Sequence, residues 1–298
     1  LYSGFDEYLV DEQMVDQFYA GESVYIEKED KAGLLANQFI MLVSTGNEKK
    51  TALCRFMAYG IPLRKVQEHK QGLWGVRARN KEQSFALDLL MDPKVQIVSL
   101  VGKAGSGKTL LAIAAGLEQV INNQTTMSMA MSKNAPVEGV YRRLVVSRPI
   151  QPMGKDIGFL PGDVDDKMKP WLAPIEDNLK FLTGNNNSTL EMYIEKGVIE
   201  MEALTYIRGR SIANAFIIID EAQNLSRHEV KTILTRAGEG TKIVLTGDIE
   251  QIDNIYINET STGLVHAVER LKKFDIAGHV TLRKGERSKL ATVAAKNL

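Results

Sequence analysis

The chain has 298 residues, of which 44% are hydrophobic and 25% charged, and its 37 basic and 37 acidic side chains leave a net charge of zero. This composition excludes a largely disordered chain, and the single cysteine, Cys54, excludes a scaffold of internal disulfides. No apolar run approaches the roughly 20 residues of a membrane helix, and the acidic start lacks the features of a signal peptide, so we expect a cytoplasmic protein. The first residue is Leu1 and not Met, which suggests a fragment.

Residues 1–75 predict a small β-rich module. Extended-looking pieces at 23–26, 39–43 and 52–57 are separated by glycine turns. Alternatively, these strands extend a larger upstream domain.

From about residue 82, strands alternate with helices. We expect helices at 83–91, 108–121, 165–181, 188–196, 226–236, 262–273 and 286–297, and strands at 95–101, 144–147, 198–204, 216–219 and 242–246. Pro170 and Pro174 are expected to interrupt the helix at 165–181. The alternation predicts an α/β fold with a parallel sheet covered by helices on both faces.

A glycine-rich segment between a predicted strand and a predicted helix matches the phosphate-binding loop, G-x-x-x-x-G-K-[ST]. Its backbone N–H groups and the helix N-terminus would hold the phosphates of ATP. Lys108 would reach the β- and γ-phosphates, and the Thr109 hydroxyl would ligate Mg²⁺. The expected nucleotide contacts are Gly102, Lys103, Ala104, Gly105, Ser106, Gly107, Lys108, Thr109 and Leu110.

Two further buried strands end in polar residues. Asp220 follows the strand 216–219 and is placed to hold Mg²⁺, while Glu221 beside it can accept a proton from an attacking water. Gln251 follows the strand 242–246 and could position that water or sense the phosphate. The carboxyl ends of parallel strands share one edge, so these groups should meet.

These segments together resemble the PhoH family of ATPases, whose domain is similar to the first RecA-like lobe of superfamily 1 helicases. The resemblance is carried by 147–149, 158–163, 208–211, 214–224 and 246–248, and it spans residues 78–298. It divides the chain into a connecting module, 1–77, and the ATPase domain, 78–298. Residues 79–86 and 285–291 look more like the branch in which a PIN ribonuclease domain comes first. We find no PIN-like carboxylate cluster in residues 1–75, so nuclease activity is not expected here.

The resemblance also implies roles for single residues. From spacing alone Gln83 is a surface residue, but the resemblance implies that it reads adenine. Gln251 takes the place of a helicase glutamine, although Ile252-Asp253 follows it where many helicases have Leu-Pro-Pro. No second lobe follows, so the resemblance favours a ring, expected to be hexameric, in which Arg287 from a neighbour completes the site. Arg283 and Lys284 are alternative candidates for this role, and Arg287 could instead be a surface residue.

The sequence indicates nucleic-acid binding less specifically than it indicates nucleotide binding. The stretch 141–170 is locally basic and includes Met153 and Phe159, a mixture that can track a phosphate backbone and stack bases. Composition alone favours a solvated face, and RNA as the strand follows from the resemblance only. Candidate contacts are Arg148, Lys155, Arg208 and Arg210.

Three functions compete at this point. The first is an oligomeric RNA-remodelling ATPase, coupled in a longer protein to a PIN nuclease. The second is a slow ATP-dependent switch that changes partner binding without motor work. A small-molecule kinase is the third, and Glu221 argues against it, since a carboxylate directly after the metal-binding aspartate points to hydrolysis.

Overall fold

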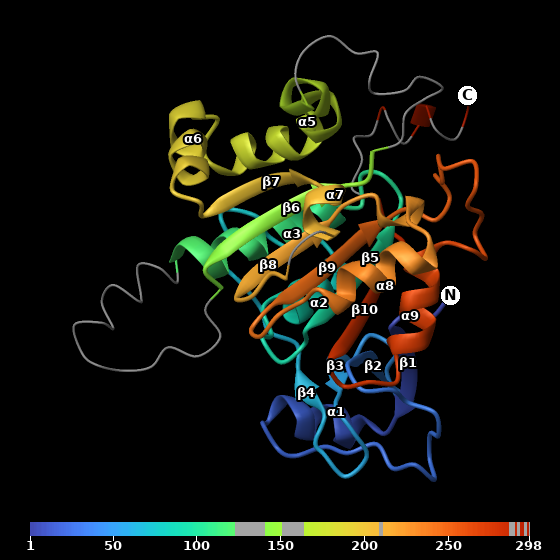
Figure 1. Cartoon of the computed structure of the whole chain (residues 1–298). Helices are drawn as coiled ribbons and strands as arrows, with labels where there is room; N and C mark the ends of the chain where they lie inside the picture. Colours follow the sequence, from blue (N-terminus) through green and yellow to red (C-terminus); the bar gives the residue numbers. More distant parts are fainter. Residues whose placement is uncertain are drawn as a thin grey trace.

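A parallel sheet lies at the centre of the computed structural model, which describes residues 1–122, 141–150, 164–208 and 211–285, and positions 290, 293, 294 and 297. Within these residues it has six strands in the order β10-β5-β9-β8-β6-β7, and each neighbouring pair is parallel (Figure 1). Their bounds are β5 Ile97–Gly102, β6 Arg143–Arg148, β7 Ile199–Ala203, β8 Ala215–Ile219, β9 Lys242–Gly247 and β10 Ala277–Leu282. Every residue of β8 and β9 is buried, as expected for strands that are covered on both faces.

Helices cover both faces of this sheet, each over its own hydrophobic core. One face carries α2 Lys81–Leu90, α3 Lys108–Leu117, α5 Val164–Leu182 and α6 Asn187–Glu195. The other carries α7 Leu204–Arg208, α8 Arg227–Thr235 and α9 Gly263–Leu271. A capping box opens α8, because Ser226 and Glu229 each bind the other's backbone N–H. This arrangement confirms the predicted α/β fold.

The N-terminal residues form a second, smaller sheet in the order β1-β2-β3-β4. Its elements are β1 Phe5–Val10, α1 Glu12–Tyr19, β2 Gln38–Ser44, β3 Thr51–Phe56 and β4 Arg64–Lys65. Phe39 of β2 stacks on Phe85 of α2 with ring centroids 4.4 Å apart, and both belong to the same hydrophobic core. The β-rich module therefore packs directly against α2, one of the helices that cover the larger sheet.

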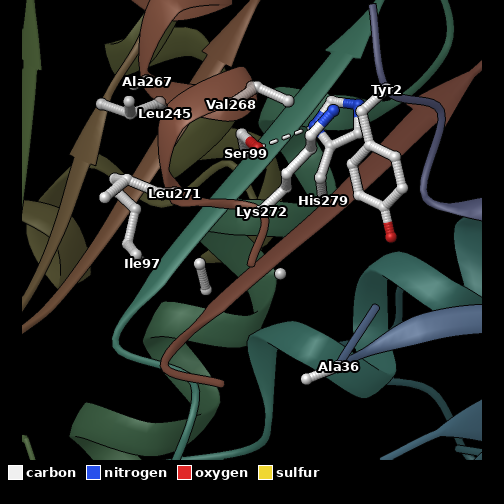
Figure 2. Close-up of a pocket in the computed structure, with 12 residues that line it drawn as sticks. Tyr2, Ala36, Ile97, Ser99, Leu245, Ala267, Val268, Leu271, Lys272 and His279 are labelled. Carbon is white, nitrogen blue, oxygen red and sulfur yellow. Dashed lines mark hydrogen bonds between the residues drawn. The ribbon is translucent and has the colours of Figure 1, made fainter. Parts of the chain in front are cut away.

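The N-terminal segment is also fastened to β10, the strand at one edge of the large sheet. Figure 2 shows His279 of β10 beside Tyr2, with its ring hydrogen-bonded to Ser99 of β5. The Ser99 Oγ to His279 Nδ1 distance is 2.7 Å, and His279 Nε2 lies 2.8 Å from Thr281 Oγ1. Burial lowers the pKa of His279 to about 3, so the imidazole is neutral and bridges two hydroxyls. The backbone N–H of Tyr2 donates to Glu269 Oε1 at 2.6 Å.

Buried charges join the module to the large domain on the opposite side of β10. Arg55 of β3 contacts Asp88 at 3.2 Å and Asp92 at 2.9 Å, and all three side chains are buried. Lys242, at the start of β9, donates to the carbonyl oxygens of Leu89 and Asp92 at 2.6 and 2.8 Å. Since buried charges persist only when paired, this network fixes how β3, α2 and β9 meet.

Several sequence-based expectations are wrong. α5 runs unbroken from Val164 to Leu182 through Pro170 and Pro174, because buried Ile175 and Leu179 hold it on the core. β1, α1 and β10 were not predicted, and 23–26 is not a strand, although Val24 and Ile26 are buried. The expected helix 286–297 falls mostly outside the described residues. No helix of the described part is long and apolar enough to cross a bilayer.

Candidate active site

The phosphate-binding loop connects β5 to α3 at the carboxyl edge of the sheet. Gly105 and Gly107 have φ of 84° and 86°, a left-handed conformation that favours glycine. A Cβ on Gly102 would lie 2.7 Å from the carbonyl oxygen of Leu282, so the loop leaves no room there for a side chain. The hydroxyl of Ser106 is buried and has no hydrogen-bond partner among the described residues.

The lysines of this loop take different partners. Lys108 Nζ donates to the backbone oxygen of Lys103 at 3.4 Å, which folds it back over the loop. Lys103 forms an exposed ion pair with Glu250 at 3.1 Å, and solvent weakens such pairs. Lys108 is therefore held near the loop by a single long hydrogen bond.

Asp220 lies where the loop meets β8 and β9, as the parallel sheet predicts. Its Oδ1 accepts hydrogen bonds from the hydroxyls of Thr109 at 2.9 Å and Thr246 at 2.7 Å, and its side chain is buried. A hydroxyl and a carboxylate that already touch form a donor set of oxygen atoms, the ligand type that Mg²⁺ prefers.

Glu221 adopts a strained backbone, with φ of 54° in the left-handed region. Each oxygen of its carboxylate has a side-chain partner. Nη2 of Arg148, the last residue of β6, lies 3.6 Å from Oε1. The side-chain amide of Gln223 donates to Oε2.

Gln223 links three segments of the site, and sequence reasoning missed it. The side chain is fully buried, and Nε2 donates both to Glu221 and, at 3.1 Å, to the backbone oxygen of Gln251. Its Oε1 accepts from the backbone N–H of Asp248 at 3.2 Å. Gln251 thus lies near Glu221 through its backbone, while its side chain is exposed. Two of the partners of Gln223, Asp248 and Gln251, are 25 and 28 residues away in sequence, so no local pattern could indicate these contacts.

Asn224 fastens the loop that follows Gln251, another role that the sequence did not indicate. Its Oδ1 accepts from the backbone N–H groups of Asp253 and Asn254 at 2.8 and 3.2 Å. The loop beyond displays Ile255 and Tyr256, which are 87% and 88% exposed. A fixed loop thus presents an aliphatic and an aromatic side chain to solvent.

Gln83 does not lie on the surface, so the interpretation from spacing alone was wrong. The side chain is buried because α2 packs against the phosphate-binding loop. Nε2 donates to the backbone oxygen of Ser106 at 3.0 Å, and Oε1 accepts from the backbone N–H of Arg79 at 2.8 Å. Gln83 therefore supports the loop in this structure, and adenine reading would require its amide to exchange partners.

Of the residues expected to bind nucleic acid, Arg148 is the one whose side chain is described, and it lies at the site. Arg208 ends α7, with its side chain outside the described residues. Lys155, Arg210 and Arg287 lie outside the described residues altogether. Arg283 follows β10, and its backbone N–H donates to Glu82 Oε2 at 3.1 Å.

Comparison with known proteins decides the family. The family model described as PhoH-like protein matches residues 75–127 and 123–295. The chain belongs to the PhoH family. It is 44% identical over 297 residues to the protein named PhoH2 of Bacillus subtilis (strain 168), a match that covers 99% of this chain and 64% of that protein. It is 40% identical over 227 residues to PhoH2 of Mycolicibacterium smegmatis, covering 76% of this chain and 48% of the relative.

The PhoH chain therefore spans less than two thirds of the length of these relatives. Among solved structures, it is similar to the large terminase of the thermophilic bacteriophage D6E, with 12% identity and a TM-score of 0.36, covering 74% of this chain and 50% of that one. Family membership and the phosphate-binding loop together support an enzyme that hydrolyses nucleoside triphosphates.

Proposed function

We propose that this PhoH protein is a Mg²⁺-dependent ATP hydrolase. One observation carries the proposal: Asp220 Oδ1 joins Thr109 of the phosphate-binding loop to Thr246 of β9, with Glu221 next along the chain. A candidate metal-binding pair and a candidate base thus lie beside the phosphate-binding loop motif. The small-molecule kinase is not proposed, since Glu221 has the place of a base for water.

The residues present fit MgATP. Left-handed Gly105 and Gly107 turn the loop backbone into a cradle, and the buried Ser106 hydroxyl has no hydrogen-bond partner within the described part of the chain. Thr109 and Asp220 would hold Mg²⁺, which when bound offsets the negative charge of the phosphates. Lys108 would leave its weak contact with Lys103 and bind the β- and γ-phosphates.

Glu221 is the proposed general base. Its carboxylate would take a proton from the attacking water, while Gln223 holds it in position. Arg287 from a neighbouring subunit would stabilise the charge on the transferred group, which requires a ring of subunits, expected to be hexameric. Gln83 is proposed to read the adenine base. Gln251 is proposed to sense whether the γ-phosphate is present.

Single-stranded RNA is the proposed partner, and remodelling of RNA the proposed work, coupled to a PIN nuclease in a longer protein. Arg148 supports this, since it lies beside Glu221 at the strand ends. Exposed Tyr256 offers an aromatic face for base stacking at the loop fixed by Asn224. Lys155, Arg208 and Arg210 are further proposed contacts.

One observation favours the second candidate, a slow ATP-dependent switch. Both oxygens of Glu221 are engaged, by Arg148 and Gln223, which restrains the proposed base. The rate of ATP hydrolysis with and without single-stranded RNA separates the two functions. Strong stimulation supports the RNA-dependent motor, and a slow rate that RNA leaves unchanged supports the switch.

A further inference from the structure

We propose that Arg148 restrains the base Glu221, and that a phosphate of bound single-stranded RNA draws Arg148 away and starts hydrolysis. This inference rests on the proposed function, because it assigns a regulation to the same site. Arg148 is a positioning residue in this account: it acts on Glu221 and takes no part in the chemistry itself.

The two partners of the Glu221 carboxylate differ in how accessible they are to solvent. Gln223 is fully buried and is tied to Asp248 and to Gln251 as well, so it cannot move without breaking the loop that follows β9. The Arg148 side chain is 24% exposed and contacts Glu221 Oε1 across 3.6 Å, a long ion pair. Of these two partners, Arg148 is the one that an external ligand can reach.

The ion pair should slow hydrolysis because it holds Oε1 against Arg148 at the end of β6. A base must instead lie within about 3.2 Å of the water that it activates. Withdrawal of Arg148 would free Oε1, while Gln223 continues to hold Oε2. The result is a positioned base with one oxygen available.

Phosphate is the natural competitor for Arg148. A guanidinium can bind phosphate with two parallel hydrogen bonds, a stronger geometry than the 3.6 Å ion pair with Glu221. A nucleic-acid strand passing the carboxyl end of β6 would present such groups. The same site therefore couples strand binding to ATP turnover through one side chain.

The test compares ATP turnover of four proteins with and without single-stranded poly(U), at saturating ATP and Mg²⁺. The proteins are the wild type, Arg148→Ala, Arg148→Lys and Arg143→Ala. Arg143 is the matched control, because it lies on the same strand and forms a similarly exposed ion pair with Glu200 at 2.8 Å, away from Glu221. Thermal melting checks that each variant is folded.

We expect Arg148→Ala to raise the RNA-free kcat about 3- to 10-fold with the KM for ATP unchanged, and to lose most of the stimulation by poly(U). Arg148→Lys keeps a cation near Glu221 and should restore part of the restraint. Arg143→Ala should resemble the wild type in both assays. A rise in kcat is a result that general structural damage does not give.

An RNA-free rate of Arg148→Ala that is unchanged or lower overturns the restraint, and a lower one would mean that Arg148 itself assists the reaction. If Arg148→Ala hydrolyses ATP faster than the wild type but poly(U) does not stimulate the wild type, the release of Arg148 by nucleic acid is overturned. Failure of the proposed function has a different signature, namely turnover that Lys108→Ala leaves intact. In that case the measured activity does not come from this site, and both proposals fall.

Discussion

Single side chains at the sheet edge each connect two or three segments of the chain. Asp220 joins the phosphate-binding loop to β9, and Gln223 joins Glu221 to the segment that contains Asp248 and Gln251. In a parallel sheet the strands end side by side, so neighbouring strand ends place such residues within hydrogen-bond reach. Lys108 is the exception, with one long contact to its own loop.

Lys108→Ala should abolish ATP hydrolysis and leave the fold intact. The lysine would supply a point charge to the transferring phosphate, and its loss removes transition-state stabilisation worth about 10²-fold or more in rate. Phosphate release under saturating ATP measures the effect, with thermal melting as the check on folding. Turnover near the wild-type rate in a folded variant would remove the assignment of this loop.

The chemistry-bearing elements could be predicted from the sequence, because their signals are local. The glycine spacing of residues 102–109 and the apolar runs that became β8 and β9 each lie within ten residues. β10 could not be predicted, since Gly278, His279 and Thr281 break the apolar pattern expected of a covered strand. Its stability comes from pairing with β5 and from the distant N-terminal segment, which binds Thr281 N–H through the carbonyl of Ser3.

Lys242 at the start of β9 should make the stability of the protein depend on pH. Burial lowers its pKa from the ordinary 10.5 to about 7 in the folded protein. Between these values the unfolded chain binds one proton more than the folded one, so the free energy of unfolding should rise with pH. The slope is at most about 1.4 kcal/mol per pH unit.

Urea unfolding of the wild type and Lys242→Met between pH 7 and 8.5 measures this slope. The variant should show a smaller rise than the wild type, whatever its absolute stability. Lys65→Met, which removes an exposed lysine on β4, should keep the wild-type slope. Equal slopes in the wild type and Lys242→Met would mean that Lys242 keeps its proton in the folded state.

At the scale of the whole molecule, the β-rich module and the part of the chain that forms the larger sheet share buried contacts. Phe39 stacks on Phe85, and Arg55 reaches Asp88 and Asp92. The sequence predicted a separate β-rich module but not this attachment, because the paired charges come from segments over 30 residues apart. The division at residue 77 stays a prediction, and the two parts meet through a common core.

The proposed ring predicts that two inactive variants repair each other. Arg287→Ala should lose turnover but keep ATP affinity and assembly, and Glu221→Gln should behave alike. In a mixed ring, a subunit with intact Glu221 can meet a neighbour with intact Arg287. Since an arginine at the transferred phosphoryl group is worth roughly 10³–10⁵ in rate, a few such sites should be detectable.

This repair is measured as ATP turnover at a series of mixing ratios, after the subunits have exchanged. Arg283→Ala is the comparison variant, because Arg283 is the rival for the same role. A flat baseline with exchange independently confirmed would exclude Arg287 as a residue acting between subunits. If mixing Arg283→Ala with Glu221→Gln restores turnover, and mixing Arg287→Ala with Glu221→Gln does not, the role belongs to Arg283.

The central claim is that this sheet edge hydrolyses ATP with Glu221 as the base, and Glu221→Gln tests it most directly. Nucleotide binding and Mg²⁺-dependent phosphate release are measured on the same preparations of wild type and variant. We predict that the variant binds ATP with near wild-type affinity, because Lys108, Thr109 and Asp220 remain, while its turnover falls about 10²- to 10⁴-fold. Turnover near the wild-type rate, or loss of ATP binding together with turnover, would contradict the account.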